Sequence, residues 1–268
     1  MRDVASDLKM QASDLSRPAM AKSDDGMTGY RQRFFTAYVS SHLGTYRTIS
    51  SEAFARDRRV FRQHLGRFLP AHRDAAILDL GCGYGSLLHF LQSMGYGNTA
   101  GIDVSEEQVG AARTLGIRNV EVAEAADFLR RRAGRYDLIT ALDVLEHFTK
   151  DEAVELLDLV LAALRSGGRV VLRVPNGDSP FASWIRYGDF THELIYTPTS
   201  IRQVLRVVGF TDVEVYPVEP VVHGAASAAR WLLWKGITQL VRLYLLIEQG
   251  TPGSGVFTAN LLATATRP

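Results

Sequence analysis

Cysteine is almost absent from this sequence, which has one, Cys82, among 268 residues. A single cysteine excludes a disulfide framework and indicates a reducing compartment. Long apolar runs are missing too: nowhere do about eighteen apolar residues follow one another, the minimum for a helix that crosses a membrane. We therefore expect a cytoplasmic protein.

An excess of charge of one sign is also lacking. Thirty Lys and Arg residues face twenty-nine Asp and Glu residues, a net charge of +1. The arginine runs at 56–59 and 130–132 are short and typical of solvated helix faces. No strong positive field is available to gather a polyanion. Nucleic acid is therefore not an expected partner.

The chain divides into three parts. Residues 1–26 are polar, mix both charges and lack the apolar core of a signal peptide, so we expect a disordered leader. Residues 27–74 are expected to form an N-terminal helical lid, in which Tyr30, Phe34 and Tyr38 share one helix face. Residues 75–268 are expected to form one domain, interrupted by a helical insert at about 220–250.

From residue 75 onward, strand patterns and helix patterns alternate. Repeated β-α-β units predict a Rossmann-like, doubly wound sheet of the α/β class, with right-handed crossovers. The last two of seven strands follow each other without a crossover helix of the usual kind, which predicts an antiparallel hairpin at one edge. The expected strands lie at 75–81, 98–104, 119–125, 136–143, 168–176, 213–219 and 255–267.

A glycine-rich turn follows the first of these strands. Asp79 precedes Gly81, Gly83 and Gly85, which allow a sharp turn and a close approach of ligand to backbone. The spacing is G-x-G-x-G rather than the G-x-G-x-x-G of dinucleotide sites, and an acid beside it would repel a pyrophosphate. Asp103, at the end of the next strand, is placed to accept from two ribose hydroxyls. A ribose and a cationic head together predict S-adenosylmethionine.

With this motif the sequence resembles the class I S-adenosylmethionine-dependent methyltransferases over about residues 75–175. The resemblance implies that Asp79 and the glycine loop lie along the methionine moiety and that Asp103 binds the ribose. It also implies an acid after the third strand for the adenine amino group. Glu124 is our choice for this role and Asp127 is its rival. Three apolar residues complete the expected cofactor site, namely Val104, Ala125 and Leu142.

Two histidines are candidates for the catalytic base. Methyl transfer to a hydroxyl requires removal of its proton, and an imidazole is suited to this near neutral pH. His147 follows the fourth strand, where the ligand crevice of such sheets lies. His192 follows the fifth strand, with Asp189 and Glu193 nearby. Each has a structural alternative, since His147 can cap a short helix and His192 can hold a loop.

The same segment offers ligands for a divalent ion such as Mg²⁺. Asp143, Glu146 and His147 supply two carboxylates and an imidazole within five residues. The Glu-His pair resembles the ubiquinone-biosynthesis O-methyltransferases, which implies a metal that assists deprotonation of the acceptor. Side chains in a compact turn often point to different sides, so a metal-free site stays open.

The insert between the last two strands has an apolar face. On a helical wheel, Lys235, Thr238, Gln239 and Arg242 gather opposite a broad apolar face. Packing over the pocket, a homodimer contact and peripheral attachment to the inner face of a membrane are the alternatives. The apolar face consists of Leu232, Leu233, Gly236, Ile237, Leu240, Leu243, Tyr244 and Ile247.

The acceptor is narrowed by what the sequence lacks. Enzymes that methylate amino groups of nucleic acids have an N-P-P-[YF] tetrapeptide after the fourth strand. This sequence has none there. The flanking segments are similar to bacterial methyltransferases of surface-polysaccharide or O-antigen assembly, which implies a sugar hydroxyl on a glycan or its precursor. The alternatives are a lipophilic phenol or quinone and, in another class, a non-catalytic module that binds the cofactor.

Overall fold

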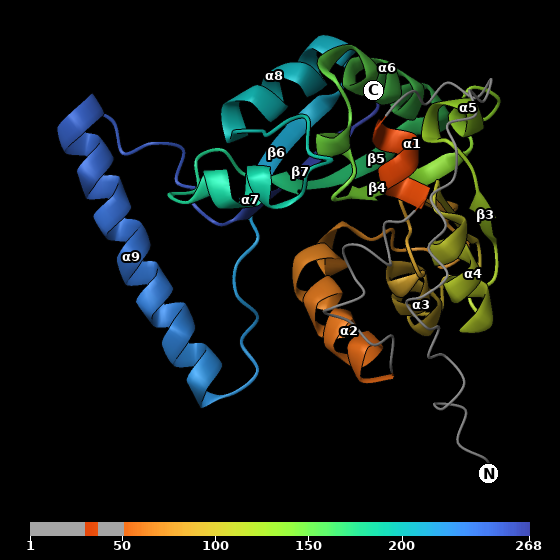
Figure 1. The fold of residues 1–268 in the computed structure, drawn as a ribbon, viewed down its shortest axis with the longest axis horizontal. Helices are drawn as coiled ribbons and strands as arrows, with labels where there is room; N and C mark the ends of the chain where they lie inside the picture. Colours follow the sequence, from red (N-terminus) through yellow and green to blue (C-terminus); the bar gives the residue numbers. More distant parts are fainter. Residues whose placement is uncertain (1–29, 37–50) are drawn as a thin grey trace.

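The structure is a computed structural model that describes residues 30–36 and 51–268. These residues form a seven-stranded sheet with helices on both faces (Figure 1). The strand order is β3-β2-β1-β4-β5-β7-β6, and β7 runs antiparallel to both of its neighbours. The predicted mostly parallel, doubly wound sheet with an antiparallel C-terminal hairpin is confirmed. The expected leader lies outside the described residues.

Each predicted strand is present, although β5 begins four residues earlier than the pattern indicated. The strands are β1 (Ile77–Leu80), β2 (Thr99–Asp103), β3 (Val120–Val122), β4 (Tyr136–Leu142), β5 (Leu164–Pro175), β6 (Thr211–Pro217) and β7 (Asn260–Thr266). The helices are α1 (Tyr30–Thr36), α2 (Ser51–Leu65), η3 (Gly66–Phe68), α3 (Ser86–Ser93), α4 (Glu106–Thr114), α5 (Ala125–Leu129), η4 (Leu145–His147), α6 (Lys150–Ala163), α7 (Ala182–Gly188), α8 (Pro198–Val208) and α9 (Ala225–Gln249).

The alternation of side chains along the central strands builds a core on each face of the sheet. In β1, Leu78 and Leu80 pack with α5, α6 and α8, whereas Ile77 packs with α2 and α3 on the other face. All three side chains are at most 1% exposed. Strands buried on both faces are read as continuous apolar runs, which is the pattern of residues 75–81.

Helix ends follow the local sequence. Thr149 and Glu152 form a capping box at the start of α6, and Thr197 caps α8 in front of Pro198. Gly209 ends α8 in the left-handed region, with φ of 112°. These caps fix the loops that leave the carboxyl ends of the strands.

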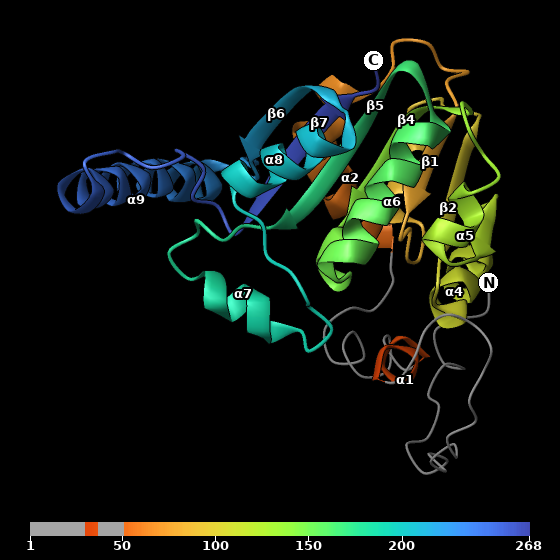
Figure 2. The same ribbon diagram turned by 90° about the horizontal axis from the view of Figure 1, so that it is seen from above.

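The helical insert is a single long helix, α9, which projects beyond the β6–β7 edge of the sheet (Figures 1 and 2). Within α9 the one buried residue is Ser227. The insert therefore does not pack over the carboxyl ends of the central strands, one of the alternatives we considered. Across residues 30–36 and 51–268, no helix has both the length and the apolarity to cross a membrane.

Candidate functional site

A cavity of about 560 Å³ opens at the carboxyl ends of the strands. It lies where the strand order reverses, between β1 and β4, the usual ligand position in open α/β sheets. Its walls come from the loops after β1, β2, β3 and β4 and from α1. Of the predicted cofactor residues, those that line it are Gly81, Gly83, Asp103, Val104, Glu124, Ala125 and Leu142.

The glycine loop requires glycine at both of its outer positions. Gly81 has φ of 66°, and a Cβ there would come 2.4 Å from Cγ2 of Val144. Gly85 has φ of 81°, and a Cβ there would come 2.9 Å from Cγ2 of Ile117. Gly81 lines the cavity, whereas Gly85 is absent from its walls and caps the start of α3. The loop thus combines a ligand surface with tight packing.

Asp103 joins the glycine loop to the end of β2. One carboxylate oxygen accepts from the Gly83 N–H at 2.9 Å and the other from the Ser105 N–H at 2.8 Å. Burial raises the pKa of this carboxyl, and the two backbone donors oppose the shift. Each oxygen keeps a lone pair for a ribose hydroxyl. Asp103 is therefore both a cavity wall and the support of the loop.

Asp79 lies beneath the cavity rather than in its wall. Its side chain is buried and accepts a hydrogen bond from Thr140 Oγ1 at 2.7 Å. Burial raises the pKa of Asp79 to about 7, with the Thr140 hydroxyl opposing and the Asp103 carboxylate adding to the shift. A cationic ligand in the cavity would favour the ionised carboxylate. The predicted contact with the methionine moiety stays a prediction.

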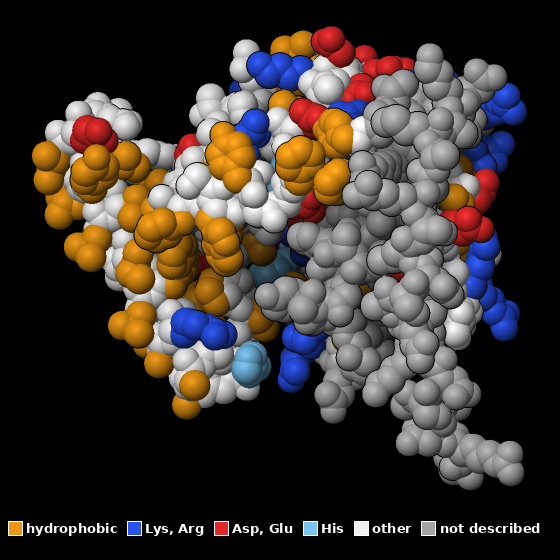
Figure 3. Space-filling view, in the orientation of Figure 1, with side chains coloured by type: hydrophobic (Ala, Val, Ile, Leu, Met, Phe, Trp, Pro, Cys, Tyr) orange, Lys and Arg blue, Asp and Glu red, His pale blue; other side chains and the backbone are white. Residues whose placement is uncertain are grey.

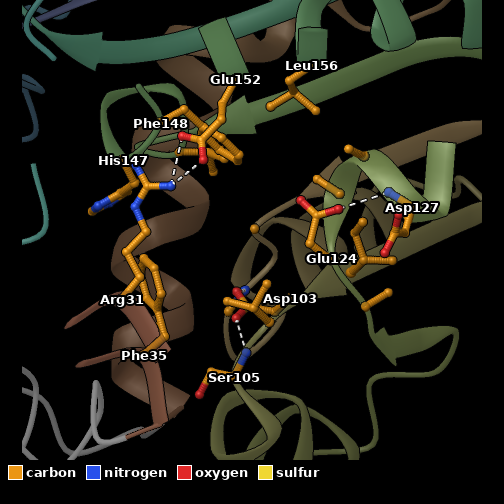
Figure 4. Close-up of a pocket in the computed structure, with 18 of the residues that line it drawn as sticks. Arg31, Phe35, Asp103, Ser105, Glu124, Asp127, His147, Phe148, Glu152 and Leu156 are labelled. Atoms are coloured by element: carbon orange, nitrogen blue, oxygen red, sulfur yellow. Dashed lines mark hydrogen bonds and ion pairs between the residues drawn. The ribbon is translucent and has the colours of Figure 1, made fainter. Parts of the chain in front are cut away.

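The expected adenine side contains both candidate acids. Glu124 caps α5 by accepting from the Asp127 N–H at 2.9 Å (Figure 4). Asp127 forms an ion pair with Arg130. Both acids line the cavity, between apolar walls that include Ile102 and Leu142. The cap leaves the other Glu124 oxygen available to an amino group. Neither assignment is decided by this geometry.

The two predicted histidines are brought together. The rings of His147 and His192 meet edge-on with centroids 5.0 Å apart. His147 lines the cavity and His192 does not. Burial lowers the pKa of His147, and the neighbouring His192 lowers it further. His147 is therefore neutral near pH 7.

Hydrogen bonds fix the orientation of both rings. The Thr191 hydroxyl donates to Asp189 Oδ1 at 2.7 Å, so it accepts from His147 Nδ1–H at 2.9 Å. His192 Nδ1–H donates to the Ile185 carbonyl oxygen at 3.1 Å. In the neutral rings the proton is then on Nδ1, which leaves Nε2 as the acceptor. The Asp189–Thr191–His147 chain is the arrangement by which proteins orient a general base.

The predicted metal ligands do not assemble as a group. Asp143 receives the guanidinium of Arg173, with Nε 2.8 Å from Oδ1. Glu146 and His147 are joined instead by His192, with ligand atoms within 4.8 Å of one another. Two imidazoles and a carboxylate suit a transition metal better than Mg²⁺, which prefers oxygen ligands.

Glu146 itself is buried, and its Oε2 has no hydrogen-bond partner among the described residues. Burial, and then the Asp143 carboxylate, raise the pKa of this carboxyl well above its usual range. Burial therefore favours the neutral carboxylic acid over the carboxylate. An unpartnered buried oxygen fits a bound cation or water equally well, so the group is compatible with a metal-free site.

Helix α1 forms the remaining wall. Arg31 Nη1 bonds both Glu152 oxygens, at 2.7 and 2.8 Å, and Phe35 contacts the His147 ring edge-on. Figure 4 shows Arg31, Phe35 and His147 across the cavity from Asp103 and Glu124. In the predicted aromatic stripe, Phe34 stacks on Phe190 and Tyr30 meets the same ring edge-on, and Tyr38 lies outside the described residues.

Several of these residues were not identified from the sequence. Arg31 and Thr191 carried no motif, and only their partners in the fold reveal them. Tyr84, in the cavity wall, donates to Asp57 of α2 at 3.0 Å, and Ser86 donates to the same oxygen at 2.8 Å. Its position between two glycines of the loop could have identified Tyr84 as a residue of the cavity wall.

A family model and several known proteins match this chain. A family model described as a methyltransferase domain covers residues 54–215. The ribosomal protein L11 methyltransferase of Dechloromonas aromatica is 33% identical over 96 residues, 36% of this chain and 31% of that protein. The ubiquinone biosynthesis O-methyltransferase of Aromatoleum aromaticum is 30% identical over 105 residues, 37% of this chain and 44% of that protein. The chain thus spans less than half the length of these relatives.

Solved structures share the fold. A SAM-dependent methyltransferase from Archaeoglobus fulgidus has a TM-score of 0.61 and 20% identity, covering 84% of this chain and 100% of that one. Phosphoethanolamine N-methyltransferase 2 of Haemonchus contortus, in complex with S-adenosyl-L-methionine, has a TM-score of 0.57 and 17% identity, covering 91% and 61%. Since the family model spans more than half of the sequence, the chain belongs to the class I S-adenosylmethionine-dependent methyltransferases.

Proposed function

We propose that the chain transfers the methyl group of S-adenosylmethionine to a hydroxyl of a sugar, on a glycan or a glycan precursor. The observation that carries this proposal is the neutral His147 ring, which lines the cavity and is oriented by Thr191 and Asp189. A neutral amine acceptor needs no base to attack a methyl group, whereas a hydroxyl must lose its proton.

The cavity walls fit the cofactor. The sharply turned glycine loop admits a ligand close to the backbone, Asp103 retains lone pairs for ribose hydroxyls, and the apolar walls suit an adenine ring. S-adenosylmethionine supplies a methyl group on a sulfonium and becomes S-adenosylhomocysteine when that group leaves. Glu124 or Asp127 is available for the adenine amino group.

In this proposal His147 accepts the acceptor's proton at Nε2 while the hydroxyl oxygen attacks the methyl carbon. The imidazolium that forms is stabilised through Nδ1–H by Thr191 and, behind it, Asp189. Asp103 and the glycine loop position the cofactor, and alignment supplies most of the acceleration. His192 supports the ring of His147 and helps to keep it neutral.

A sugar acceptor is supported by the polar groups that surround the outer cavity. Arg31 and Glu152 line the cavity and provide donors and acceptors for several hydroxyls, and Glu193 lies beside Arg31 and accepts from Tyr30. The likeness of the flanking segments to bacterial surface-polysaccharide methyltransferases points to the same acceptor class.

A lipophilic phenol is the second candidate. The observation in its favour is the relatedness to proteins named ubiquinone biosynthesis O-methyltransferase, one of which is 30% identical to this chain over 105 residues. A divalent ion held by Glu146, His147 and His192 belongs to this candidate, where it would act as a Lewis acid on the phenol oxygen in place of a histidine base.

The test is methyl transfer from labelled S-adenosylmethionine to two acceptor pools, nucleotide- and lipid-linked glycans in one and catechol-type phenols in the other. We expect a labelled methyl ether on a sugar, found by mass spectrometry of the product. A labelled phenol ether would show that the acceptor is a phenol and not a sugar. A labelled amine, or no labelled product from either pool, would contradict O-methylation.

A further inference from the structure

Helix α9 carries a large apolar surface that the described chain leaves uncovered. Eight of its apolar side chains are 49–77% exposed: Leu232, Leu233, Ile237, Leu240, Leu243, Tyr244, Leu246 and Ile247. Isolated exposed apolar residues are normal, but contiguous patches of this size mark interaction sites. Something is therefore expected to cover α9.

The charges of α9 lie away from this surface. At 100° per residue, the exposed apolar side chains from Leu232 to Ile247 share one broad sector, and no charged side chain falls within it. The polar sector contains Lys235 and Arg242, with Arg230 near the start of the helix. Lys235 is paired with Glu219, and Glu248 in the last turn is the single acid of α9. The helix is thus amphipathic and net positive.

A second exposed apolar surface adjoins the first. In the α7 segment, Phe181, Trp184, Tyr187 and Phe190 are 72–80% exposed. Figure 3 shows hydrophobic side chains gathered over both α9 and the region of α7 on the same face of the molecule. Between α9 and the residues just before Phe181 lies a hollow lined by Asp178, Pro180, Ile237, Leu240, Val241, Tyr244 and Leu245.

We propose that α9, together with the aromatic residues of α7, docks on the surface of an anionic lipid bilayer. An apolar helix face with cations on the polar side is the pattern of helices that lie in the membrane interface. Exposed tryptophan, tyrosine and phenylalanine side chains favour the same region of the bilayer. The cations of α9 complement anionic headgroups.

Docking on a bilayer also narrows the class of acceptor, an inference that rests on the proposed function. Phe190 stacks on Phe34 of α1 at 5.2 Å, and Phe35 of the same helix lines the cavity. The apolar surface therefore continues from α9 through α7 to the cavity wall. The acceptor class that fits is a hydroxyl borne on a lipid-anchored molecule, which reaches the cavity without leaving the bilayer.

The test of docking does not depend on turnover. The full chain is sedimented with phosphatidylcholine vesicles, with and without phosphatidylglycerol, and bound protein is measured as a function of lipid concentration. We expect binding to both vesicle types, tighter with phosphatidylglycerol and weakened by salt. Leu233→Asp and Leu240→Asp, at side chains 70% and 67% exposed, are each expected to weaken binding about tenfold or more.

Val207→Asp is the matched control, since Val207 is 77% exposed on α8, outside the proposed surface. It is expected to bind vesicles as the wild type does. Titration with S-adenosylhomocysteine shows whether each variant keeps its fold and cofactor site. Docking is overturned if the wild type fails to bind vesicles, or if all three variants bind vesicles as tightly as the wild type does. A dimer in solution that Leu240→Asp dissociates, without vesicle binding, would assign the surface to a second copy. Vesicle binding without transfer to any lipid-linked acceptor would refute only the acceptor class.

Discussion

His147 meets His192 edge-on, with ring centroids 5.0 Å apart, and each ring is fixed through its Nδ1 by a separate partner. The two histidines have different roles in the proposed reaction. His147 lines the cavity and has an Nε2 available to a proton, whereas His192 lies behind it and influences its charge. The predictions below follow from this division.

Replacing the base should separate chemistry from binding. We expect His147→Ala to lower kcat by about 10²–10⁴-fold while the affinity for S-adenosylhomocysteine changes little. His192→Ala should cost less, because that ring only supports His147. His72→Ala serves as a matched control, since His72 pairs with Asp137 at the amino end of β4. Steady-state kinetics and calorimetry measure both quantities, and equal losses in all three variants would refute the assignment.

Asp103 should affect cofactor binding in two ways, as an acceptor for the ribose hydroxyls and as the support of the glycine loop. Asp103→Asn turns one acceptor oxygen into a donor that faces a backbone N–H, either of Gly83 or of Ser105. The loss of a charge-assisted hydrogen bond is worth roughly 1.5–3 kcal/mol, so we expect affinity for S-adenosylmethionine to fall about tenfold or more. Calorimetric titration measures this. Unchanged affinity in a folded variant would remove Asp103 from the ribose site.

Asp79 should make stability fall as pH rises. Its carboxyl has a pKa of about 7 in the fold against 3.8 in the unfolded chain, so the folded state holds a proton that the unfolded state has lost. Stability is then highest at low pH in this window, declines as pH rises from about 4 to about 7 by on the order of a few kcal/mol, and is level above it.

Asp79→Asn removes this decline and keeps the acceptor for Thr140. We expect the variant to be more stable than the wild type at pH 8 and similar to it at about pH 4, close to the unfolded pKa of 3.8, below which the carboxyl is mostly protonated in both the folded and the unfolded chain. Thermal unfolding at the two pH values is the measurement. Parallel curves for the two proteins would show that Asp79 is ionised throughout.

Metal removal should leave turnover unchanged. His147 presents an unprotonated Nε2 without an ion, and burial raises the pKa of Glu146, which favours the neutral acid that glutamine resembles in shape. We expect EDTA to have no effect and Glu146→Gln to retain activity within about threefold, as for substitutions that only alter packing. Inhibition by EDTA that Mn²⁺ or Zn²⁺ reverses, with matching losses in Glu146→Gln and His147→Ala, would establish a metal site instead.

The cofactor side of the cavity was predictable because it depends on backbone geometry. Gly81, Gly83 and Asp103 follow from the turn and from the strand end, and they line one cavity, whereas Gly85 caps α3 outside it. The acceptor side was not predictable in the same way. His192 reaches His147 because the Glu193 and Leu194 N–H groups donate to the Glu146 carbonyl, a contact between distant segments.

Asp143 shows the same limit of local patterns. Its proximity to Glu146 and His147 in sequence indicated a shared metal, but strand pairing decides its partner. Leu142 of β4 is in register with Arg173 of β5, so the Arg173 guanidinium lies beside Asp143. For α9, the wheel identified the apolar face, whereas its projection beyond the sheet edge depends on the two connecting segments.

The pH dependence of kcat in wild type and His147→Ala tests the account most directly. A base with a lowered pKa is unprotonated over most of the physiological range, so the wild-type rate should rise through a pKa below 6.5, the ordinary value for histidine, and then level off. In His147→Ala the residual rate should lose this rise, with cofactor affinity retained. The same rise in both proteins would contradict the assignment of His147 as the group that takes the proton.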